Sequence, residues 1–264
     1  MHIDEYLNRI NYTGSREPCM ETLQQLQLAH LLNVPFENLD IHSKTPIVLD
    51  VENIYKKVVV HKRGGFCYEL NGLFIELLTA FGFKAWRISA RVHRLDETYS
   101  PEYDHMAIIV HLDNDDYLAD VGFGEFALGP LKLETGTIQA DARGNFVLEN
   151  YEDNYLRVSK IIDGSAKPEY IFRNVPRAFD EFKDMCYYQQ TSPLSHFTQK
   201  KLISRPTLNG RITLTGNSLK ITEGNMINEI TVPDEADFNA QLWKYFSLKA
   251  PCNENSKQEI LDVP

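Results

Sequence analysis

Cys67 is the residue of this sequence best placed for covalent chemistry. It lies in the stretch RGGFCYELNGLF, directly after Gly64 and Gly65, and it opens a run of apolar residues at helical spacing that stops before Gly82. A thiol at a helix N-terminus lies at the positive end of the helix dipole, which favours the nucleophilic thiolate. The glycines would let the backbone approach closely and leave room for a substrate carbonyl and for N–H donors to its oxyanion. We therefore expect Cys67 to be a nucleophile.

A thiol nucleophile needs a base, and the base needs a partner that orients it. Of the eight histidines, His105 opens the strand candidate HMAIIV, and Asp120 lies in the apolar strand candidate YLADV that follows. A hairpin that turns at Asn114-Asp115 would place Asp120 opposite Ile109, on the face of His105 but roughly 13 Å along the strand. Contact between the two side chains would then require a bulge or a shifted register.

Each of these three residues has a plainer interpretation when taken alone. The cysteine could be a small core residue, the histidine a satisfied polar group and the aspartate a turn residue. Together, in helix-then-hairpin order, they favour a catalytic triad. The sequence has no G-x-S-x-G, H-E-x-x-H or Walker motif, which argues against serine hydrolases, zinc proteases and nucleotide-binding enzymes.

The remaining cysteines and the overall charge limit the possible partners. Cys19, Cys186 and Cys252 show no C-x-x-C or metal-ligand spacing, so we expect free thiols and no metal site. The 37 acidic and 27 basic residues give a net charge of -10, which argues against nucleic acid or an anionic membrane as the main partner. There is no membrane-length apolar run and no signal-peptide pattern, so we expect a cytoplasmic protein.

Three segments are expected to position these residues, which predicts an α+β fold. Residues 1–82 show helical periodicity, and from residue 83 the period changes to two, as in AWRISARV, before a helical pattern returns near 177–189. Residues 191–264 combine short strands with a helix that carries Phe238 and Leu242. The strands of this last segment are separated by turn signals at Asn209-Gly210, Gly216-Asn217 and Gly224-Asn225.

Five motifs, in this order, resemble those of arylamine N-acetyltransferases of the bacterial type. They are PFENLDIH at 35–42, RGGFCYELNGLF at 63–74, YDHMAIIV at 103–110, YLADVGFG at 117–124 and TSPLSHF at 191–197. The resemblance extends to about residue 215. It implies a helical domain (1–82) and a β-barrel domain (83–190) that form a core like that of thiol proteases, followed by an α/β lid (191–264).

The resemblance also implies a function and a set of site residues. The triad would be Cys67, His105 and Asp120, and acetyl-CoA would donate an acetyl group to an arylamine or arylhydrazine through an acetyl-cysteine. The acceptor pocket would map onto Phe36, Val92, Phe123 and Phe197, and contacts to CoA onto Gly124 and Lys200. Core packing is the alternative for the three phenylalanines. The competing functions are a thiol hydrolase or transglutaminase-like enzyme and a non-enzymatic scaffold.

Overall fold

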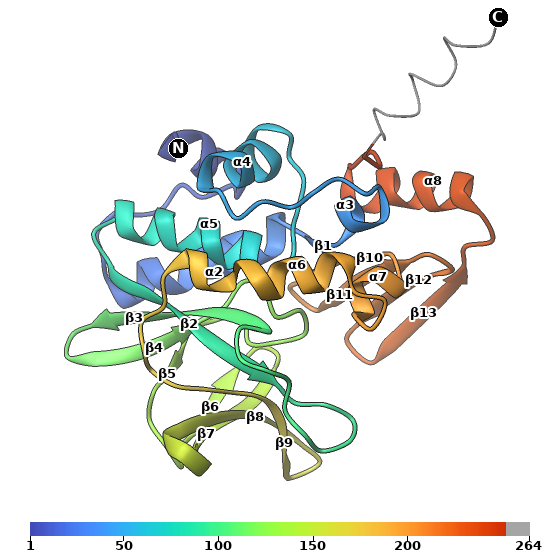
Figure 1. The fold of residues 1–264 in the computed structure, drawn as a ribbon. Coiled ribbons are helices and arrows are strands. Elements are labelled where there is room, and N and C mark those ends of the chain that lie inside the picture. Colours follow the sequence, from blue (N-terminus) through green and yellow to red (C-terminus); the bar gives the residue numbers. More distant parts are fainter. Residues whose placement is uncertain (252–264) are drawn as a thin grey trace, which may run out of the picture.

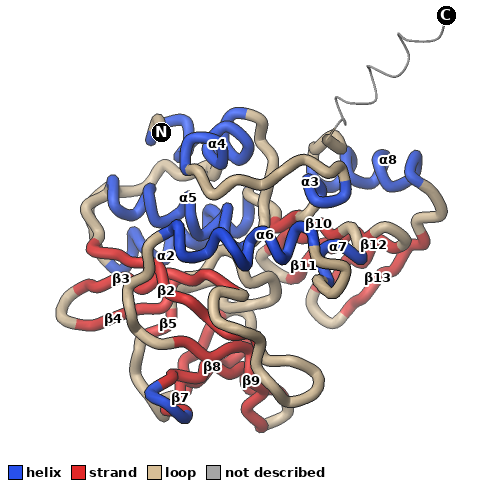
Figure 2. The backbone as a smooth tube through the Cα atoms, in the orientation of Figure 1, coloured by secondary structure: helices blue, strands red, loops and turns tan. Residues whose placement is uncertain are grey.

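A layer of helices lies over a curved sheet, and a smaller α/β unit lies beside both (Figures 1 and 2). The computed structural model describes residues 1–251. Its N-terminal helices are α1 (Ile3–Arg9), α2 (Met20–Asn33), α3 (Leu39–His42), α4 (Val51–Tyr55), the π-helical turn η1 (Lys56–Val60) and α5 (Cys67–Ala80). As predicted, α5 begins at Cys67 and ends before Gly82, whose φ of 88° is a conformation that glycine adopts readily.

The sheet beneath the helices is almost closed into a barrel. Its strands are β2 (Lys84–Val92), β3 (His105–Leu112), β4 (Asp115–Ala119), β5 (Leu131–Lys132), β6 (Ile138–Asp141), β7 (Gly144–Tyr151), β8 (Tyr155–Ile162) and β9 (Ser165–Phe172), with the short helix η2 (Glu152–Asn154) between β7 and β8. The order is β5-β4-β3-β2-β9-β8-β7-β6, so β5 and β6 are the edges. The Gln139 side chain of β6 exchanges two 2.8 Å hydrogen bonds with the backbone of Lys132 in β5, which joins these edges.

The β3–β4 hairpin turns one residue earlier than the Asn114-Asp115 turn considered above. Asp113 and Asn114 have φ values of 52° and 70°, as a two-residue turn with two left-handed positions requires. Ile109 therefore lies opposite Leu118, and Asp120 is shifted two residues toward His105. Asp120 itself follows the last residue of β4, so it lies just beyond the strand and not inside it.

The smaller unit is the predicted α/β lid. After η3 (Phe179–Phe182) and α6 (Lys183–Thr191), it contains α7 (His196–Gln199), β10 (Leu202–Thr207), β11 (Gly210–Thr215), β12 (Ser218–Glu223), β13 (Met226–Thr231) and α8 (Glu235–Phe246). The three turns predicted between its strands are present. The two-residue strand β1 (Phe36–Glu37) pairs with β10, so the helical segment supplies an edge of the lid sheet. The boundaries near residues 83 and 190 remain predictions.

Two apolar clusters lie where α5 meets the sheet and inside the barrel. Leu70, Leu73 and Leu77 of α5 pack in one cluster with Ile108 and Val110 of β3. The opposite face of the sheet points into the barrel. There Ile88 and Ala90 of β2 join Ala107 and Ile109 of β3 and the rings of Phe146, Tyr170 and Phe172. Alternation along β2 and β3 thus attaches the helix on one face and fills the barrel with the other.

Thiols, metals and membranes can be described for residues 1–251. Cys19, Cys67 and Cys186 are free thiols, and Cys252 lies outside the described residues. Within the same range, no group of three His, Cys, Asp or Glu side chains is placed to bind a metal ion. None of the described helices has the length and apolar character needed to cross a membrane.

Candidate active site

Cys67 is the first residue of α5, and its position is set by the residues around the helix start. Glu69 lies in the first turn, and its carboxylate accepts a 3.2 Å hydrogen bond from the backbone N–H of Phe66, one of the groups a helix start leaves unpaired. A Cβ on Gly64 would lie 2.0 Å from the Pro35 carbonyl oxygen, and one on Gly65 would lie 2.8 Å from Glu69. The glycines therefore permit the close approach that was expected, and the groups they approach are Pro35 and Glu69.

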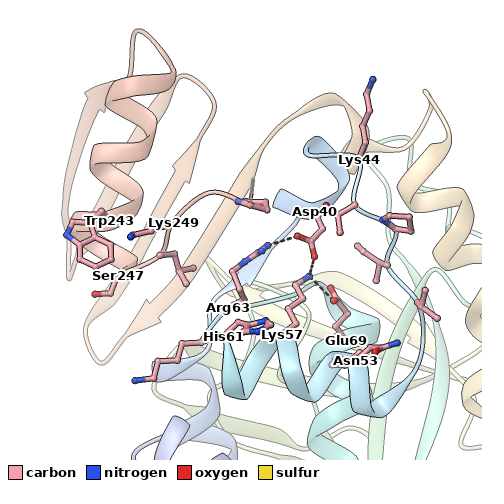
Figure 3. A pocket seen from close by; sticks show the side chains of 18 residues that line it. Asp40, Lys44, Asn53, Lys57, His61, Arg63, Glu69, Trp243, Ser247 and Lys249 are labelled. Carbon is pink, nitrogen blue, oxygen red and sulfur yellow. Dashed lines mark hydrogen bonds and ion pairs between the residues drawn. The ribbon is translucent and has the colours of Figure 1, made fainter. Parts of the chain in front are cut away.

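A buried network of charges surrounds this helix start (Figure 3). Lys57 lies 2.7 Å from both Asp40 and Glu69, and Arg63 lies 2.6 Å from Glu37 and 2.8 Å from Asp40. Burial raises the pKa of Asp40, but Lys57 and Arg63 together lower it by more, so its pKa lies below the usual value. The network also lines a cleft of about 810 Å³ whose lining residues do not include Cys67. Its role is therefore to anchor the helix start.

Position at a helix N-terminus does not by itself make Cys67 a thiolate. Burial raises the pKa of its thiol well above the usual value, and the nearby carboxylates Asp104 and Asp120 raise it further. A backbone hydrogen bond with Met106 opposes them without reversing the direction. Burial thus opposes the thiolate that the position at the helix start was expected to favour.

His105 and Asp120 form a direct pair. His105 begins β3, Asp120 follows β4, and the distance from Nε2 to Oδ2 is 2.7 Å, with exposed fractions of 3% and 2%. The Asp120 carboxylate accepts three further hydrogen bonds, from the Asn71 side chain (2.9 Å), the Gly122 backbone (2.9 Å) and the Tyr170 hydroxyl (3.1 Å). Four donors converge on one carboxylate, so this group is an acceptor only.

This arrangement selects the tautomer of His105. Because the carboxylate only accepts, Nε2 carries the proton and Nδ1 is the basic nitrogen of the neutral ring. The ring is fixed by edge contacts with Phe123 and Tyr170, at centroid distances of 5.0 and 5.3 Å. An oriented imidazole with one free basic nitrogen is what a thiol nucleophile requires.

Cys67 and His105 line one cavity of about 780 Å³, and the predicted acceptor residues line it with them. These are Phe36, Val92, Phe123 and Phe197. Gly122 passes so close to the nucleophile that a Cβ there would lie 2.7 Å from the Cα of Cys67. The two predicted CoA contacts are not among the described lining residues: Lys200 is exposed, and Gly124 lies in the loop after Gly122. Their roles remain predictions.

Of the basic residues Lys200, Lys201 and Arg205, the last two contact other residues of the lid. Lys201 forms an ion pair with Glu235 at 2.6 Å and lies over the ring of Phe238. Arg205 donates to the backbone carbonyl of Tyr245. These two side chains therefore form no free cationic patch with Lys200, which is the exposed cation of the three.

Sequence reasoning missed Asn71 and Tyr170. Asn71 donates to Asp120 and to the Met106 carbonyl (2.6 Å), and its side-chain oxygen accepts from the Val121 backbone (2.9 Å). It lies four residues after Cys67 as a polar residue within an apolar helical run, and this was an available signal. Tyr170 offered none, because an aromatic residue in a buried strand has the pattern of ordinary core.

Comparison with known proteins finds relatives over most of the chain. A family model described as N-acetyltransferase matches residues 19–254. The arylamine N-acetyltransferase of Mycolicibacterium smegmatis is 34% identical over 227 residues, covering 84% of this chain and 82% of the relative. Arylamine N-acetyltransferase 1 of Bos taurus is 32% identical over 239 residues, covering 83% and 82%.

Solved structures agree with this relationship. The arylamine N-acetyltransferase of M. tuberculosis matches with a TM-score of 0.87 at 30% identity, covering 93% of both chains. The Mycobacterium marinum enzyme, solved in complex with CoA, matches with a TM-score of 0.86 at 30% identity, covering 93% of this chain and 92% of that one. The family match over most of the sequence, together with the shared fold of helices on a barrel-like sheet, places this chain in the arylamine N-acetyltransferase family of acyltransferases.

Proposed function

We propose that this protein moves the acetyl group of acetyl-CoA to an arylamine or arylhydrazine through an acetyl-cysteine on Cys67. The observation that carries the proposal is the 2.7 Å pair of His105 and Asp120, which leaves Nδ1 basic in the cavity that Cys67 also lines. Membership of the family supports the acetyl transfer. The related M. marinum enzyme, solved with CoA, supports acetyl-CoA as the donor.

The first half-reaction loads the enzyme. Nδ1 of His105 takes the proton of the Cys67 thiol, and the thiolate attacks the thioester carbonyl of acetyl-CoA, with the oxyanion stabilised by backbone N–H groups. The new Sγ–C bond forms as the bond from carbon to the CoA sulfur breaks. The imidazolium returns its proton to the departing CoA thiolate, and neutral acetyl-Cys67 remains.

The second half-reaction unloads it. The amine nitrogen attacks the acetyl carbonyl of Cys67, forming the amide bond as the Sγ–C bond breaks. His105 accepts a proton from the amine nitrogen and delivers it to Sγ. Asp120 stabilises the imidazolium in both halves, because its carboxylate lies 2.7 Å from the ring nitrogen that stays protonated.

The acceptor and donor occupy different parts of the proposed site. An aromatic ring fits against Phe36 and Phe197, whose centroids lie 6.0 Å apart, and against Phe123, with Val92 completing the apolar wall. We assign Gly124 and the exposed Lys200 to CoA. Gly124 supports this because a Cβ there would meet no atom within 4 Å, so a ligand can approach its backbone.

The thiol of Cys186 is the internal control for the acylation test. It is also buried, and burial raises its pKa to about 12, but its described partner is Gln190 and it does not line the cavity. After brief exposure to acetyl-CoA, mass spectrometry should find one acetyl group, on the peptide that contains Cys67. Acetylation at Cys186 instead, or at no cysteine, would refute the mechanism.

Adding an acceptor then separates transfer from hydrolysis. With aniline or phenylhydrazine present, the acetyl group of Cys67 should appear on the amine or hydrazine nitrogen. Release of free acetate at the same rate with and without the acceptor would instead identify a thiol hydrolase.

A further inference from the structure

The loop that carries Phe123 is attached at both ends to the barrel. It runs from Asp120 to Gly129 without helix or strand. At its start, the Gly122 backbone donates to Asp120, and at its end the backbone N–H groups of Leu128 and Gly129 donate to the carboxylate of Asp141. Its middle needs a separate attachment, because Gly124 has a φ of 100° and open space around its Cα.

That middle is attached to the lid by Arg211 of β11. One guanidinium nitrogen donates to the Gly124 carbonyl, and the other donates to the Ser204 hydroxyl at 2.7 Å. No carboxylate within residues 1–251 lies within 4.0 Å of this guanidinium, and its Nε is buried without a partner. Burial lowers the pKa of Arg211 to about 10, so the group is still charged at neutral pH.

Burying a cation whose partners are only carbonyl and hydroxyl oxygens is unfavourable unless its hydrogen bonds stabilise the structure. A hydrogen bond from a charged donor is stronger than one from a neutral donor. The Glu125–Lys160 ion pair, the other side-chain contact near the loop's centre, spans 3.7 Å from a largely exposed carboxylate, so it contributes little. Arg211 is thus the main attachment of the loop's centre.

We propose that Arg211 is a positioning residue for the acceptor pocket, acting through Gly124 on the ring of Phe123. Phe123 is the neighbour of Gly124 in the chain, and its ring packs against Tyr170 at 4.8 Å and against His105 at 5.0 Å. Fixing the Gly124 carbonyl limits where that ring can lie. The lid thereby sets the shape of the acceptor pocket from outside it. The acceptor part of this role depends on the acetyl transfer proposed above.

A second arginine provides a matched control. Arg143 lies in the turn between β6 and β7 of the barrel and donates to the lid carbonyls of Thr207 (2.7 Å) and Gly210. It joins barrel to lid as Arg211 does, through backbone carbonyls, and the charge of Glu125 acts on both guanidinium groups. Within residues 1–251, however, the Arg143 guanidinium donates to no backbone carbonyl of the loop at 120–129. Loss of either arginine should weaken the attachment of the lid, whereas only loss of Arg211 should release Phe123.

The kinetic test compares Arg211→Met, Arg211→Lys and Arg143→Met in the full chain. Methionine keeps much of the side-chain volume without donors, so Arg211→Met should raise KM for aniline about tenfold, and this effect should exceed any change in the rate of Cys67 acylation by acetyl-CoA. Lysine keeps one charged donor and should restore most of the affinity. Arg143→Met should leave KM for aniline unchanged.

Three results would overturn the proposal. They are an unchanged KM in Arg211→Met, an equal rise in Arg143→Met, and a failure of lysine to restore binding. Should Arg211→Met not fold, Arg211→Gln takes its place, because its shorter neutral amide lacks the charged donor.

A second measurement does not depend on enzyme activity. Hydrogen exchange followed by mass spectrometry should show faster exchange of the 122–129 peptide in Arg211→Met and of the 207–210 peptide in Arg143→Met. Equal exchange of 122–129 in both variants contradicts the anchoring role. If the wild-type protein acetylates no amine, the proposed function fails, while this comparison still tests the anchor.

Discussion

Two buried polar networks adjoin the first turn of α5, and they are built in opposite ways. The first consists of Glu37, Asp40, Lys57, Arg63 and Glu69, of which Figure 3 shows the last four. In it, each of the two cations lies within 3 Å of two carboxylates, so each of the three carboxylates has a cation as a direct partner. The second is centred on Asp120, and its donors are the neutral groups of Asn71, Gly122 and Tyr170 together with His105.

The difference shows which network can respond to the reaction. In residues 1–251, no lysine or arginine lies within 4.0 Å of Asp120, so its negative charge is unmatched until His105 becomes protonated. The donors from Asn71, Gly122 and Tyr170 are neutral, so they supply no counter-charge. The paired network gains nothing from a proton on His105. One network therefore stabilises a conformation, and the other, under the proposed mechanism, stabilises the charge that forms on His105.

The largest free-energy change should come from removing one cation of the first network. Lys57→Met leaves the buried carboxylate of Glu69 without its cation, and breaking a buried pair in this way typically costs about 3–5 kcal/mol of unfolding free energy. Urea denaturation measures that loss. The activity per folded molecule should stay within about twofold, because Lys57 contacts no reacting group.

The neighbouring lysine is the control for this substitution. Lys56 forms an exposed pair with Glu52 at 3.7 Å, and Lys56→Met should change the unfolding free energy by less than about 0.5 kcal/mol. If Lys57→Met lowered the rate of Cys67 acylation about a hundredfold in the folded protein, the distinction between the two networks would fail.

Asp120→Asn should have a smaller free-energy effect. It should lower the rate of Cys67 acylation and leave the unfolding free energy nearly unchanged. The amide cannot accept from all four donors at once, so it no longer fixes the proton on Nε2 of His105 and does not neutralise the imidazolium. We expect acylation of Cys67 to slow about a hundredfold or more, with the fold retained. Rapid-quench mass spectrometry with acetyl-CoA gives this rate.

The same hairpin contains the matched control. Asp116 accepts from Nδ1 of His111 at 2.8 Å in a second, more exposed histidine–aspartate pair that does not line the cavity. Asp116→Asn should leave acylation unchanged. Near wild-type rates in Asp120→Asn would show that Asp120 is structural, as Lys57 is.

The smallest effect should come from Tyr170→Phe. This change removes one neutral hydroxyl from Asp120 and leaves the ring packed against His105, so we expect about a fivefold slower acylation, from the roughly 1 kcal/mol that such a hydrogen bond contributes. Tyr155→Phe, which removes a hydroxyl that donates to Glu102, is the control and should affect stability alone. A loss of acylation rate as large as that of Asp120→Asn would show that the Tyr170 hydroxyl is as important for acylation as the Asp120 charge.

Local patterns predicted the elements that carry the site. Apolar spacing and Gly82 located α5, alternation located β2 and β3, and three glycine-containing turns separated the lid strands. Such features depend on neighbours a few residues apart, so their energetics can be estimated from the sequence. The hairpin register was missed because two turns built from adjacent Asp and Asn residues differ by one position, and this choice moves Asp120 by two residues.

Non-local contacts could not be predicted in the same way. Tyr170 reaches Asp120 across 50 residues, Arg211 reaches Gly124 across 87, and Lys201 and Arg205 bind within the lid. A tyrosine in a strand or an arginine near a turn has the same local pattern whether or not it meets a partner. Only the arrangement of whole elements determines which of them do.

The sequence alone therefore located the three candidate residues. Folding decides their protonation states and the groups that surround them. Local periodicity placed Cys67 at a helix start and His105 at a strand start, whereas it placed Asp120 inside the strand that it follows in the structure. The pKa of the thiol, the tautomer of the imidazole and the donors around the carboxylate depend on which groups are buried together. Desolvation and hydrogen bonding act over a few ångströms in space, and these distances are set by tertiary packing.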